Sequence, residues 1–410
     1  MTARPVKEID LPWIDFGGER YVREPLEVLR EARERYWIAN SARGLQVLTH
    51  EAVSRMALDP KLDSIGADYY TQQGGTEWII EYATNAALPM IPAPRHDRIK
   101  KVLQKGFGLK RINEMRETMR AVANRLLDRM IEQGHGDLVE DFSHRYPLEV
   151  LCTMMGVPEK DIDRFGEWTV DLGLLARYPV APHAPMIDAA LKGLYEYFTE
   201  LVAERRSAPQ NDFVSTLVTA QSEGDDLSEA ELLGALVNLL FAGHDTTRYQ
   251  FGWVIQQLMK HREQWDMVVA NPALASGAVE ETIRTEPSLT MFLRKVVEDA
   301  VYGEVLLPNG TLLTLNSYAA NHDPAMFPDP YRFDITRKNA GRQLTFGYGP
   351  HVCLGNALAR AEMTEALQVF VARVPRLALA GAAEYPEGQA TESAMRGAER
   401  LPVSMQAAAP

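Results

Sequence analysis

A chain of 410 residues with 46% hydrophobic and 24% charged residues has the composition of a globular protein with a large core. Its formal net charge of -13 excludes the basic stripe on which a nucleic-acid-binding surface depends. Two cysteines exclude a disulfide framework, and no apolar run reaches the length of a signal peptide or a membrane helix. We therefore expect a soluble cytoplasmic protein that binds neither nucleic acid nor membrane.

The N-terminal part of the chain predicts a short strand followed by helices. The strand signal is "GLQVLTH", which begins at Gly44, and a loop rich in aromatic residues and glycine follows over residues 64–94. Residues 113–134 predict a helix, because methionine, valine and leucine recur on one face at helical spacing. Cys152 lies in the apolar helical stretch "LEVLCTMMGV", so we expect it to pack in the core.

The longest predicted helix covers residues 228–261 and begins with the capping box "SEAE" at Ser228. At about 1.5 Å per residue it would be about 50 Å long, which is enough to cross a domain. The stretch "LLFAGHDTTRYQ" weakens its middle, because Gly243 costs roughly 1 kcal/mol relative to alanine and Asp245 and Thr246 are weak helix formers. Either a neighbouring helix packs closely there, or the helix loosens to admit a ligand and water, with Asp245 and Thr246 moving protons.

Two further stretches carry paired charges. In "EETIR", Glu281 and Arg284 lie three residues apart on a predicted helix, a spacing that by itself is typical of a surface ion pair. Short strand signals follow, with a hairpin turn predicted at residues 308–310. Three prolines in "ANHDPAMFPDPYRFD" predict an irregular path over residues 320–334. We expect this path to bring Arg332 into one charge network with Glu281 and Arg284.

The stretch "FGYGPHVCLG" places Cys353 in a loop just before a helix predicted over residues 356–374, which Pro375 ends. The cysteine is either a small buried hydrophobic residue or a ligand. Glycines let backbone N–H groups approach the sulfur, and a helix N-terminus favours a thiolate. Because no second cysteine lies nearby, a structural zinc or an iron–sulfur site is disfavoured, whereas one axial thiolate suits a haem iron. With a final strand in "LPVSM", the elements predict a mainly α fold with a minor β region.

Together, these four stretches resemble the cytochromes P450, the haem-thiolate mono-oxygenases. The cysteine loop matches the haem signature of that family, Phe-Gly-x-Gly-x-His-x-Cys-x-Gly, at every fixed position. "AGHDTT" is similar to the oxygen-activating groove of the family, "ETIR" to its Glu-x-x-Arg pair, and "FPDPYRFD" to the segment that supplies the third member of a triad. The resemblance runs from "REPLEVLREARE" to "LPVSM", and the length is that of the soluble bacterial members.

The resemblance implies a single P450 domain over residues 1–410, a triangular helical prism around a buried haem b, without a fused reductase or membrane anchor. It makes Cys353 the iron ligand and Asp245 and Thr246 the catalytic acid–alcohol pair, with Glu281, Arg284 and Arg332 as a structural triad. The residues that it places against haem are His96, Lys100, Ala242, Gly243, Arg294, Phe346, Gly347, His351, Cys353 and Gly355. Lys100 departs from the family pattern, because it stands where arginine is usual and lysine lacks the planar fork.

The resemblance also indicates where substrate is bound. The expected contact residues are Asn238, Phe241, Ser288, Leu289, Thr290, Met291, Phe292 and Met395, with the loop of residues 64–94. Most are apolar, which favours a small apolar or amphiphilic substrate. Asn238 hydrogen-bonds either a polar group of that substrate or another helix.

The expected reaction inserts one oxygen atom from O₂ into the substrate, by hydroxylation or oxidative O-dealkylation. Electrons are expected from NAD(P)H through a ferredoxin reductase and a ferredoxin, because the sequence shows no flavin- or nicotinamide-binding segment of its own. The basic run "KKVLQKGFGLKR", residues 100–111, is the predicted docking site for an acidic ferredoxin. The alternatives are a peroxide-driven peroxygenase and a non-catalytic haem sensor or electron carrier, and the intact Asp245–Thr246 pair disfavours both.

Overall fold

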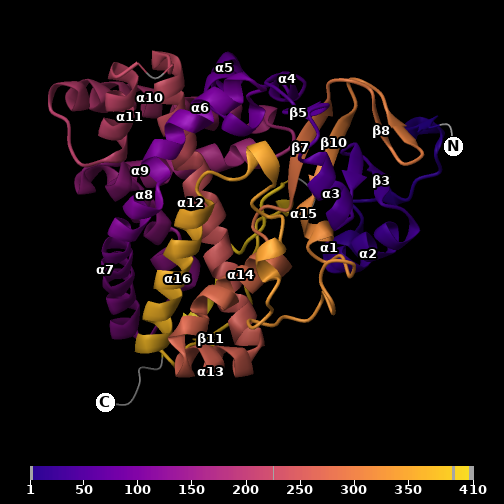
Figure 1. The fold of residues 1–410 in the computed structure, drawn as a ribbon. Coiled ribbons are helices and arrows are strands. Elements are labelled where there is room, and N and C mark those ends of the chain that lie inside the picture. The colour runs from indigo at the N-terminus through magenta and orange to yellow at the C-terminus, as the bar shows by residue number, and fades with distance from the viewer. Residues whose placement is uncertain (1–2, 225, 390–392, 406–410) are drawn as a thin grey trace.

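The computed structural model describes residues 3–224, 226–389 and 393–405. Figure 1 shows most of the long helices on one side of the molecule and most of the labelled strands on the other, beside the helices nearest the N-terminus, whereas β11 is drawn among the helices. The helices are α1 (Glu19–Arg23), α2 (Pro25–Arg35), α3 (His50–Met56), α4 (Asp68–Thr71), α5 (Glu77–Asn85), α6 (Arg95–Leu103), α7 (Leu109–Gln133), α8 (Arg145–Met155), α9 (Ile162–Gly173), α10 (Ala184–Ser207), α11 (Phe213–Ser222), α12 (Glu229–Lys260), α13 (Arg262–Ala270), α14 (Ala275–Thr285), α15 (Ser317–Ala320) and α16 (Asn356–Arg373).

Short strands form three small sheets. The strands are β1 (Arg4–Pro5), β2 (Trp13–Ile14), β3 (Ile38–Ser41), β4 (Leu45–Val47), β5 (Leu62–Asp63), β6 (His135–Asp137), β7 (Met291–Val296), β8 (Ala300–Tyr302), β9 (Val305–Leu307), β10 (Leu312–Asn316), β11 (Ala378–Leu379) and β12 (Pro402–Ser404). The largest sheet has the order β2-β3-β4-β10-β7-β5, and the others are β1-β9-β8 and β11-β12-β6. The expected mainly α fold with a minor β region is confirmed.

The predicted long helix is α12, and it packs against α5, α8, α9, α10, α14 and α16. Its N-terminus carries the predicted capping box, in which the Ser228 hydroxyl accepts from the Glu231 N–H and the Glu231 carboxylate accepts from the Ser228 N–H. The helix is continuous from Glu229 to Lys260, so the weak residues in its middle do not break it. Most of its side chains are buried, because neighbouring helices surround it.

The helix predicted over residues 113–134 begins earlier than expected, at Leu109 in α7. Leu109 is exposed, so the apolar pattern carries no signal for the first turn. The helix ends as predicted, at Gly134, which has a φ of 75° and closes the last turn by donating to the carbonyl of Met130. Cys152 is buried in α8, as expected for a core residue.

The predicted hairpin at residues 308–310 is wrong in its pairing, although the turn is present. Gly310 has a φ of 87°, and the N–H of Thr311 donates to the carbonyl of Pro308 over 3.1 Å. The turn joins β9 to β10, but these strands belong to different sheets. The physical reason is the bond of 2.7 Å from the Gly310 N–H to the Val296 carbonyl, which directs the following strand alongside β7.

Candidate functional site

The loop before α16 is shaped by its glycines. Gly347 and Gly349 have φ values of 76° and 71°, a region that side chains strain. A Cβ at Gly349 would lie 2.9 Å from the Ala57 carbonyl oxygen, so only glycine fits against that backbone. The N–H of Cys353 donates to the carbonyl of Phe346 over 2.8 Å, which closes the loop and places the cysteine just before the N-terminus of α16.

Cys353 is a free thiol that is accessible to solvent but has protein atoms around most of its side chain. Burial raises the pKa of the thiol, while hydrogen bonds from the backbone of Gly355 and Asn356 and the charge of Lys100 act to lower it. Backbone donors and a nearby cation stabilise a thiolate there once a metal displaces the proton.

Four predicted haem-binding bases come together beside this loop, from three different elements. His96 and Lys100 lie on α6, Arg294 on β7 and His351 in the cysteine loop. The rings of His96 and His351 are 4.0 Å apart between centroids. Burial, with the charges of Arg294, His96 and Lys100, lowers the pKa of His351 to about 3. Burial lowers the pKa of Arg294 to about 10 despite the opposing effect of Asp63.

The residues of this cluster fit the two propionates of a haem. Among the described residues, the carboxylate of Asp63 approaches His351 Nε2 to 3.8 Å, while the buried Nδ1 of His351 has no hydrogen-bond partner. Buried bases that repel one another are stabilised by an added anion. The charge of Lys100 acts on His96, and its ammonium group bonds to the cysteine loop, so the anion site lies close to the loop that carries the thiol, as a haem with an axial thiolate requires.

Lys100 holds the cysteine loop through its ammonium group. Its Nζ donates to the carbonyls of Pro350 over 2.5 Å and Val352 over 2.7 Å. Burial lowers the pKa of Lys100, while the charges of Cys353 and Asp97 act to raise it. The sequence predicted a propionate contact for Lys100 and contained no signal for these two loop bonds.

The middle of α12 presents one stripe that is not fully buried. Asn238 and Thr246 are half-buried and Ala242 is exposed, and these residues recur every four positions on one face of α12, with Leu239, Phe241 and Gly243 beside them also half-buried. Thr246 Oγ1 donates to the Ala242 carbonyl over 2.8 Å. A Cβ at Gly243 would lie 3.1 Å from Leu151 Cδ2 of α8, so Gly243 permits close helix packing. Close packing is therefore observed, and the expected loosening of the helix is not.

Asp245 is buried between α12 and α9. Its Oδ1 lies 3.1 Å from Arg248 Nη2 and 3.3 Å from His244 Nδ1. Its Oδ2 faces Gly173, where a Cβ would lie only 2.3 Å away. Burial acts to raise the pKa of Asp245, but Arg248 and His244 outweigh it and the pKa lies below its ordinary value. The i, i+3 spacing of Asp245 and Arg248 on the predicted helix could have indicated this ion pair, whereas the contact with Gly173 depends on how α9 is oriented and has no signal in the sequence.

The charge network around Glu281 contains Arg337 in place of the predicted Arg332. Glu281 and Arg284 form a fully buried bidentate pair with distances of 2.9 and 2.8 Å, and Arg337 Nε lies 3.0 Å from Glu281 Oε1. The prediction that Arg332 supplies the third charge is wrong. Its side chain is exposed, because the meander turns its backbone inward and the Arg332 carbonyl accepts from both Arg284 and Arg337.

The predicted substrate residues lie on α12, on the segment that enters β7, and near the C-terminus. The Tyr82 hydroxyl donates to Asn238 Oδ1 over 2.9 Å, so Asn238 forms the helix-to-helix hydrogen bond. Phe241 packs edge-on against Tyr82 with centroids 6.5 Å apart. Leu289 forms an isolated β-bridge with Met395, which joins the two distant segments. Leu289 and Phe292 are half-buried, whereas Ser288, Thr290, Met291 and Met395 are buried.

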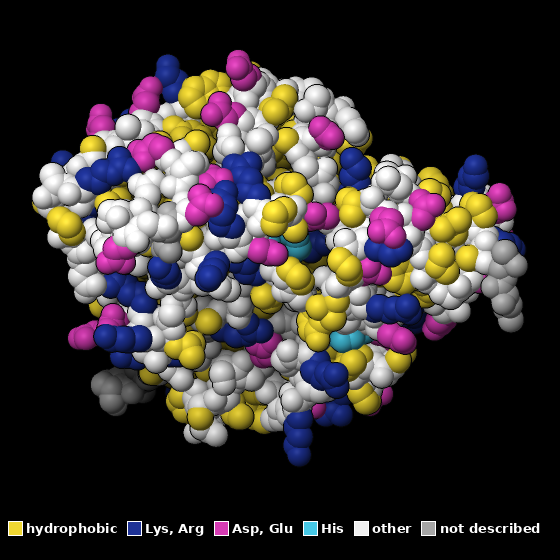
Figure 2. All heavy atoms as spheres, turned by 45° about the horizontal axis from the view of Figure 1, so that its top comes forward, with side chains coloured by type: hydrophobic (Ala, Val, Ile, Leu, Met, Phe, Trp, Pro, Cys, Tyr) yellow, Lys and Arg dark blue, Asp and Glu magenta, His cyan; other side chains and the backbone are white. Residues whose placement is uncertain are grey.

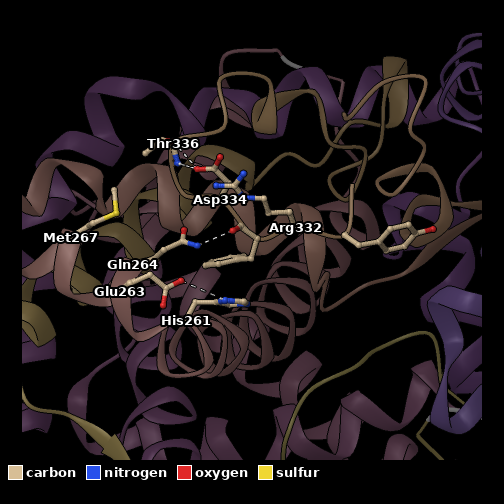
Figure 3. Close-up of a pocket in the computed structure, with 9 residues that line it drawn as sticks. His261, Glu263, Gln264, Met267, Arg332, Asp334 and Thr336 are labelled. Carbon is tan, nitrogen blue, oxygen red and sulfur yellow. Dashed lines mark hydrogen bonds and ion pairs between the residues drawn. The ribbon is translucent and has the colours of Figure 1, made fainter. Parts of the chain in front are cut away.

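A separate hollow of about 400 Å³ lies between α13 and the irregular segment before the cysteine loop (Figure 3). His261, Glu263, Gln264 and Met267 line it from the α13 side, and the other side is lined by Tyr331, Arg332, Phe333, Asp334 and Thr336. Of the predicted site residues, only Arg332 is among those that line it in the described part of the chain. Its rim bears both acids and bases, and it contains neither Cys353 nor the four-base cluster.

Comparison with known proteins agrees with this geometry. Residues 89–373 match the family model described as "Cytochrome P450". The chain is 31% identical to luteothin monooxygenase of Streptomyces thioluteus over 401 residues, 97% of either chain, and 32% identical to steroid C26-monooxygenase of Mycobacterium tuberculosis over 383 residues, 92% of either chain. It superposes on the P450 enzyme CxnD, described as forming a C–S bond in chuangxinmycin biosynthesis, with a TM-score of 0.84, 29% identity and 98% coverage of both chains.

Proposed function

Because the chain belongs to the cytochrome P450 family, a family of haem-dependent mono-oxygenases, we propose that it inserts one oxygen atom from O₂ into a small apolar or amphiphilic molecule. Hydroxylation and oxidative O-dealkylation both follow from that chemistry. We also propose that residues 1–410 act as one domain. A cytoplasmic location is supported by the two free thiols and the acidic composition.

One observation carries this proposal: Cys353, at the N-terminus of α16, lies beside four converging bases. Cys353 holds the iron in this proposal, while His96, Arg294 and His351 neutralise the propionates. Haem b supplies the oxygen chemistry when bound, and donation from a thiolate ligand favours O–O cleavage. Phe346 packs beside the loop with the Arg360 guanidinium 4.4 Å over its ring. The Gly355 backbone donates to the sulfur, and Gly347 gives the loop its turn.

Thr246 and Asp245 move protons in this proposal. The Thr246 hydroxyl faces the stripe of α12 that is not fully buried, and its bond to the Ala242 carbonyl fixes its orientation. Ala242 and Gly243 carry no bulky side chain, so a flat cofactor can approach the helix there. Asp245 adjoins Thr246 and is the nearest acid on the same helix.

An apolar substrate is supported by the character of the predicted contact residues. Phe241 on α12, Leu289 and Phe292 on the segment that enters and begins β7, and Met395 near the C-terminus are all apolar, and the Asn238 amide is already held by Tyr82. The chain is similar to a protein named steroid C26-monooxygenase, and steroids are apolar molecules of this class.

We propose a ferredoxin as the electron donor, docking on the exposed part of the basic run. Lys101, Lys105 and Lys110 are exposed, whereas Lys100 is buried and Arg111 is bonded to Asn211 over 2.7 Å. On the face drawn in Figure 2, basic and acidic side chains are interspersed, so steering by a ferredoxin would be local. Replacing Lys101 and Lys105 together with glutamate is expected to slow electron transfer in a salt-dependent way. An unchanged transfer rate would exclude this docking site.

The function is tested with haem-loaded protein, a surrogate plant-type ferredoxin, its reductase and NAD(P)H. Compounds are first screened for those that shift the haem absorption by displacing the iron-bound water. Oxygenated product that contains one atom from labelled O₂ supports the mono-oxygenase. Product formed with hydrogen peroxide alone would instead favour a peroxygenase, and haem binding without any product would favour a sensor or electron carrier.

A further inference from the structure

The side-chain amide of Asn238 has a donor that no described residue uses. Asn238 Oδ1 accepts from the Tyr82 hydroxyl over 2.9 Å, and this is the one side-chain hydrogen bond of Asn238 in the described part of the chain. Nδ2 is not among the buried atoms that lack a partner, and the side chain is half-buried, so Nδ2 is accessible. An amide nitrogen carries two hydrogens that it can donate. Within the described residues these hydrogens are available to water or to a ligand.

The orientation of this amide follows from Tyr82. Tyr82 is buried, and burial raises the pKa of its hydroxyl well above the ordinary value, so the hydroxyl keeps its hydrogen. Asn238 Oδ1 is the only acceptor that the described residues offer to this hydrogen. If the amide were flipped, Nδ2 would face the phenol oxygen and the buried O–H would lose its acceptor, which costs free energy. The bond to Tyr82 therefore leaves Nδ2 as the atom that a ligand meets.

Two contacts hold α5, which carries this tyrosine, against α12. A Cβ at Gly234 of α12 would lie 2.8 Å from the Cβ of Ala86, directly after α5, so glycine permits the close approach of the two helices. Arg95 donates to Asn85 Oδ1 over 2.8 Å and to Glu231 Oε1 over 2.7 Å, which ties the end of α5 to the start of α12. The bond between the tyrosine and the amide is thus made between two helices that are fixed against each other.

We propose that Asn238 Nδ2 donates a hydrogen bond to a carbonyl oxygen at one end of an otherwise apolar substrate, and that Tyr82 is the positioning residue that fixes this donor. This rests on the proposed function, in which substrate lies along the accessible stripe of α12 and Thr246 moves protons. Along the helix axis, Asn238 lies about 6 Å from Ala242 and about 12 Å from Thr246. We therefore expect the oxygenated carbon about 6 to 12 Å from the carbonyl oxygen of the substrate.

The amide selects for an acceptor because of what each ligand does to the water on Nδ2. A hydrocarbon that displaces this water leaves the donor unpaired, which costs free energy. A carbonyl oxygen at the same place restores the hydrogen bond. An alcohol or an ether oxygen also accepts, whereas an ammonium group only donates and would face the N–H unfavourably. The substrate class is accordingly an apolar molecule with an acceptor oxygen at one end.

The test compares two probes that share one carbon skeleton, 4-cyclohexylcyclohexanone and bicyclohexyl. Their affinities for the haem-loaded protein are measured from the shift in haem absorption on displacement of the iron-bound water, together with those of carbonyl compounds from the library screen. Asn238→Leu is expected to weaken binding of the ketones about tenfold and to leave that of bicyclohexyl unchanged. Asn238→Asp keeps the shape of the side chain but presents an acceptor, so it should weaken the ketones at least as much. Equal changes for ketones and hydrocarbon, or no weakening of the ketones, would overturn the proposal.

The role of Tyr82 is tested with Tyr82→Phe, which frees the amide to rotate. We expect about threefold weaker binding of the ketones, no change for bicyclohexyl, and no further loss when the change is added to Asn238→Leu. Tyr146→Phe is the matched control, because Tyr146 is also buried and its hydroxyl donates to a backbone carbonyl, that of Glu362. Equal losses for both probes in Tyr82→Phe would show that the tyrosine only packs, and would refute its positioning role.

Failure of this inference is distinguishable from failure of the proposed function. A protein that incorporates one atom of labelled O₂ into its product, but binds ketones equally well with and without the Asn238 amide, would defeat this inference alone. Loss of the thiolate spectrum in the unchanged protein would defeat the proposed function.

Discussion

Arg337→Ala removes one of the two guanidinium groups that neutralise the fully buried carboxylate of Glu281. Arg337 gives Glu281 one charge-assisted hydrogen bond of 3.0 Å and gives three further bonds to carbonyls in the meander. Those carbonyls are near solvent, so water replaces these bonds at little cost. Glu281 keeps its bonds to Arg284 and to the N–H of Asp334.

The expected loss is therefore that of one hydrogen bond to a charged group, about 2 kcal/mol, or about a thirtyfold change in the folding equilibrium. Arg332→Ala is the matched control, since its side chain is exposed and its contribution to the network is a carbonyl that alanine retains. We expect that variant to change stability by less than about 0.5 kcal/mol. Urea titration of the haem-loaded proteins, followed by tryptophan fluorescence, compares the two. Equal losses in both variants, or a larger loss in Arg332→Ala, would refute the assignment of Arg337.

Three other variants test separate parts of the structure. Lys100→Met should make the ferrous–carbon monoxide form lose its thiolate spectrum about thirtyfold faster, because about 2 kcal/mol of bonding to the Pro350 and Val352 carbonyls is lost. Lys100→Arg should restore the slow rate. An unchanged rate in Lys100→Met would show that the loop does not depend on these bonds. Gly173→Ala should displace the Asp245 carboxylate and slow NADPH oxidation, because the added Cβ would overlap with Asp245 Oδ2. Gly252→Ala is the control, since its Cβ meets open space. Equal rates of NADPH oxidation in the two variants would contradict the contact between Gly173 and Asp245. Burial lowers the pKa of His322 to about 3, so only the unfolded chain takes up a proton at this residue as the pH falls below about 6.5. Between pH 7 and pH 5 the free energy of unfolding should therefore fall by about 2 kcal/mol less in His322→Gln than in the unchanged protein. The same fall in both proteins would refute the buried neutral ring.

Local sequence signals predicted the parts of the site that depend on chain order. The cysteine loop, the start of α16 and the bounds of α12 follow from glycines, a capping box and helical periodicity, which act over a few residues. The convergence of His96, Arg294 and His351 was expected only from the resemblance, because α6, β7 and the loop are far apart in the sequence. Nothing in their spacing indicates a common cluster.

The wrong predictions concerned the direction of side chains and the pairing of strands. Arg332 and Arg337 lie in the same irregular segment, and the direction of each side chain depends on which carbonyls turn inward to satisfy Arg284. The turn at residues 308–310 was predicted, but its strands pair with different partners because the Gly310 N–H bonds to the end of β7.

The most direct test of the central claim is the absorption spectrum of the reduced protein under carbon monoxide, for the unchanged chain and for Cys353→Ser. We expect the red-shifted Soret band of a thiolate-ligated haem in the unchanged protein and its loss in the variant, with the fold retained as judged by circular dichroism. A folded, haem-loaded chain that lacks this band, or a variant that keeps it, would contradict the assignment of Cys353 as the iron ligand.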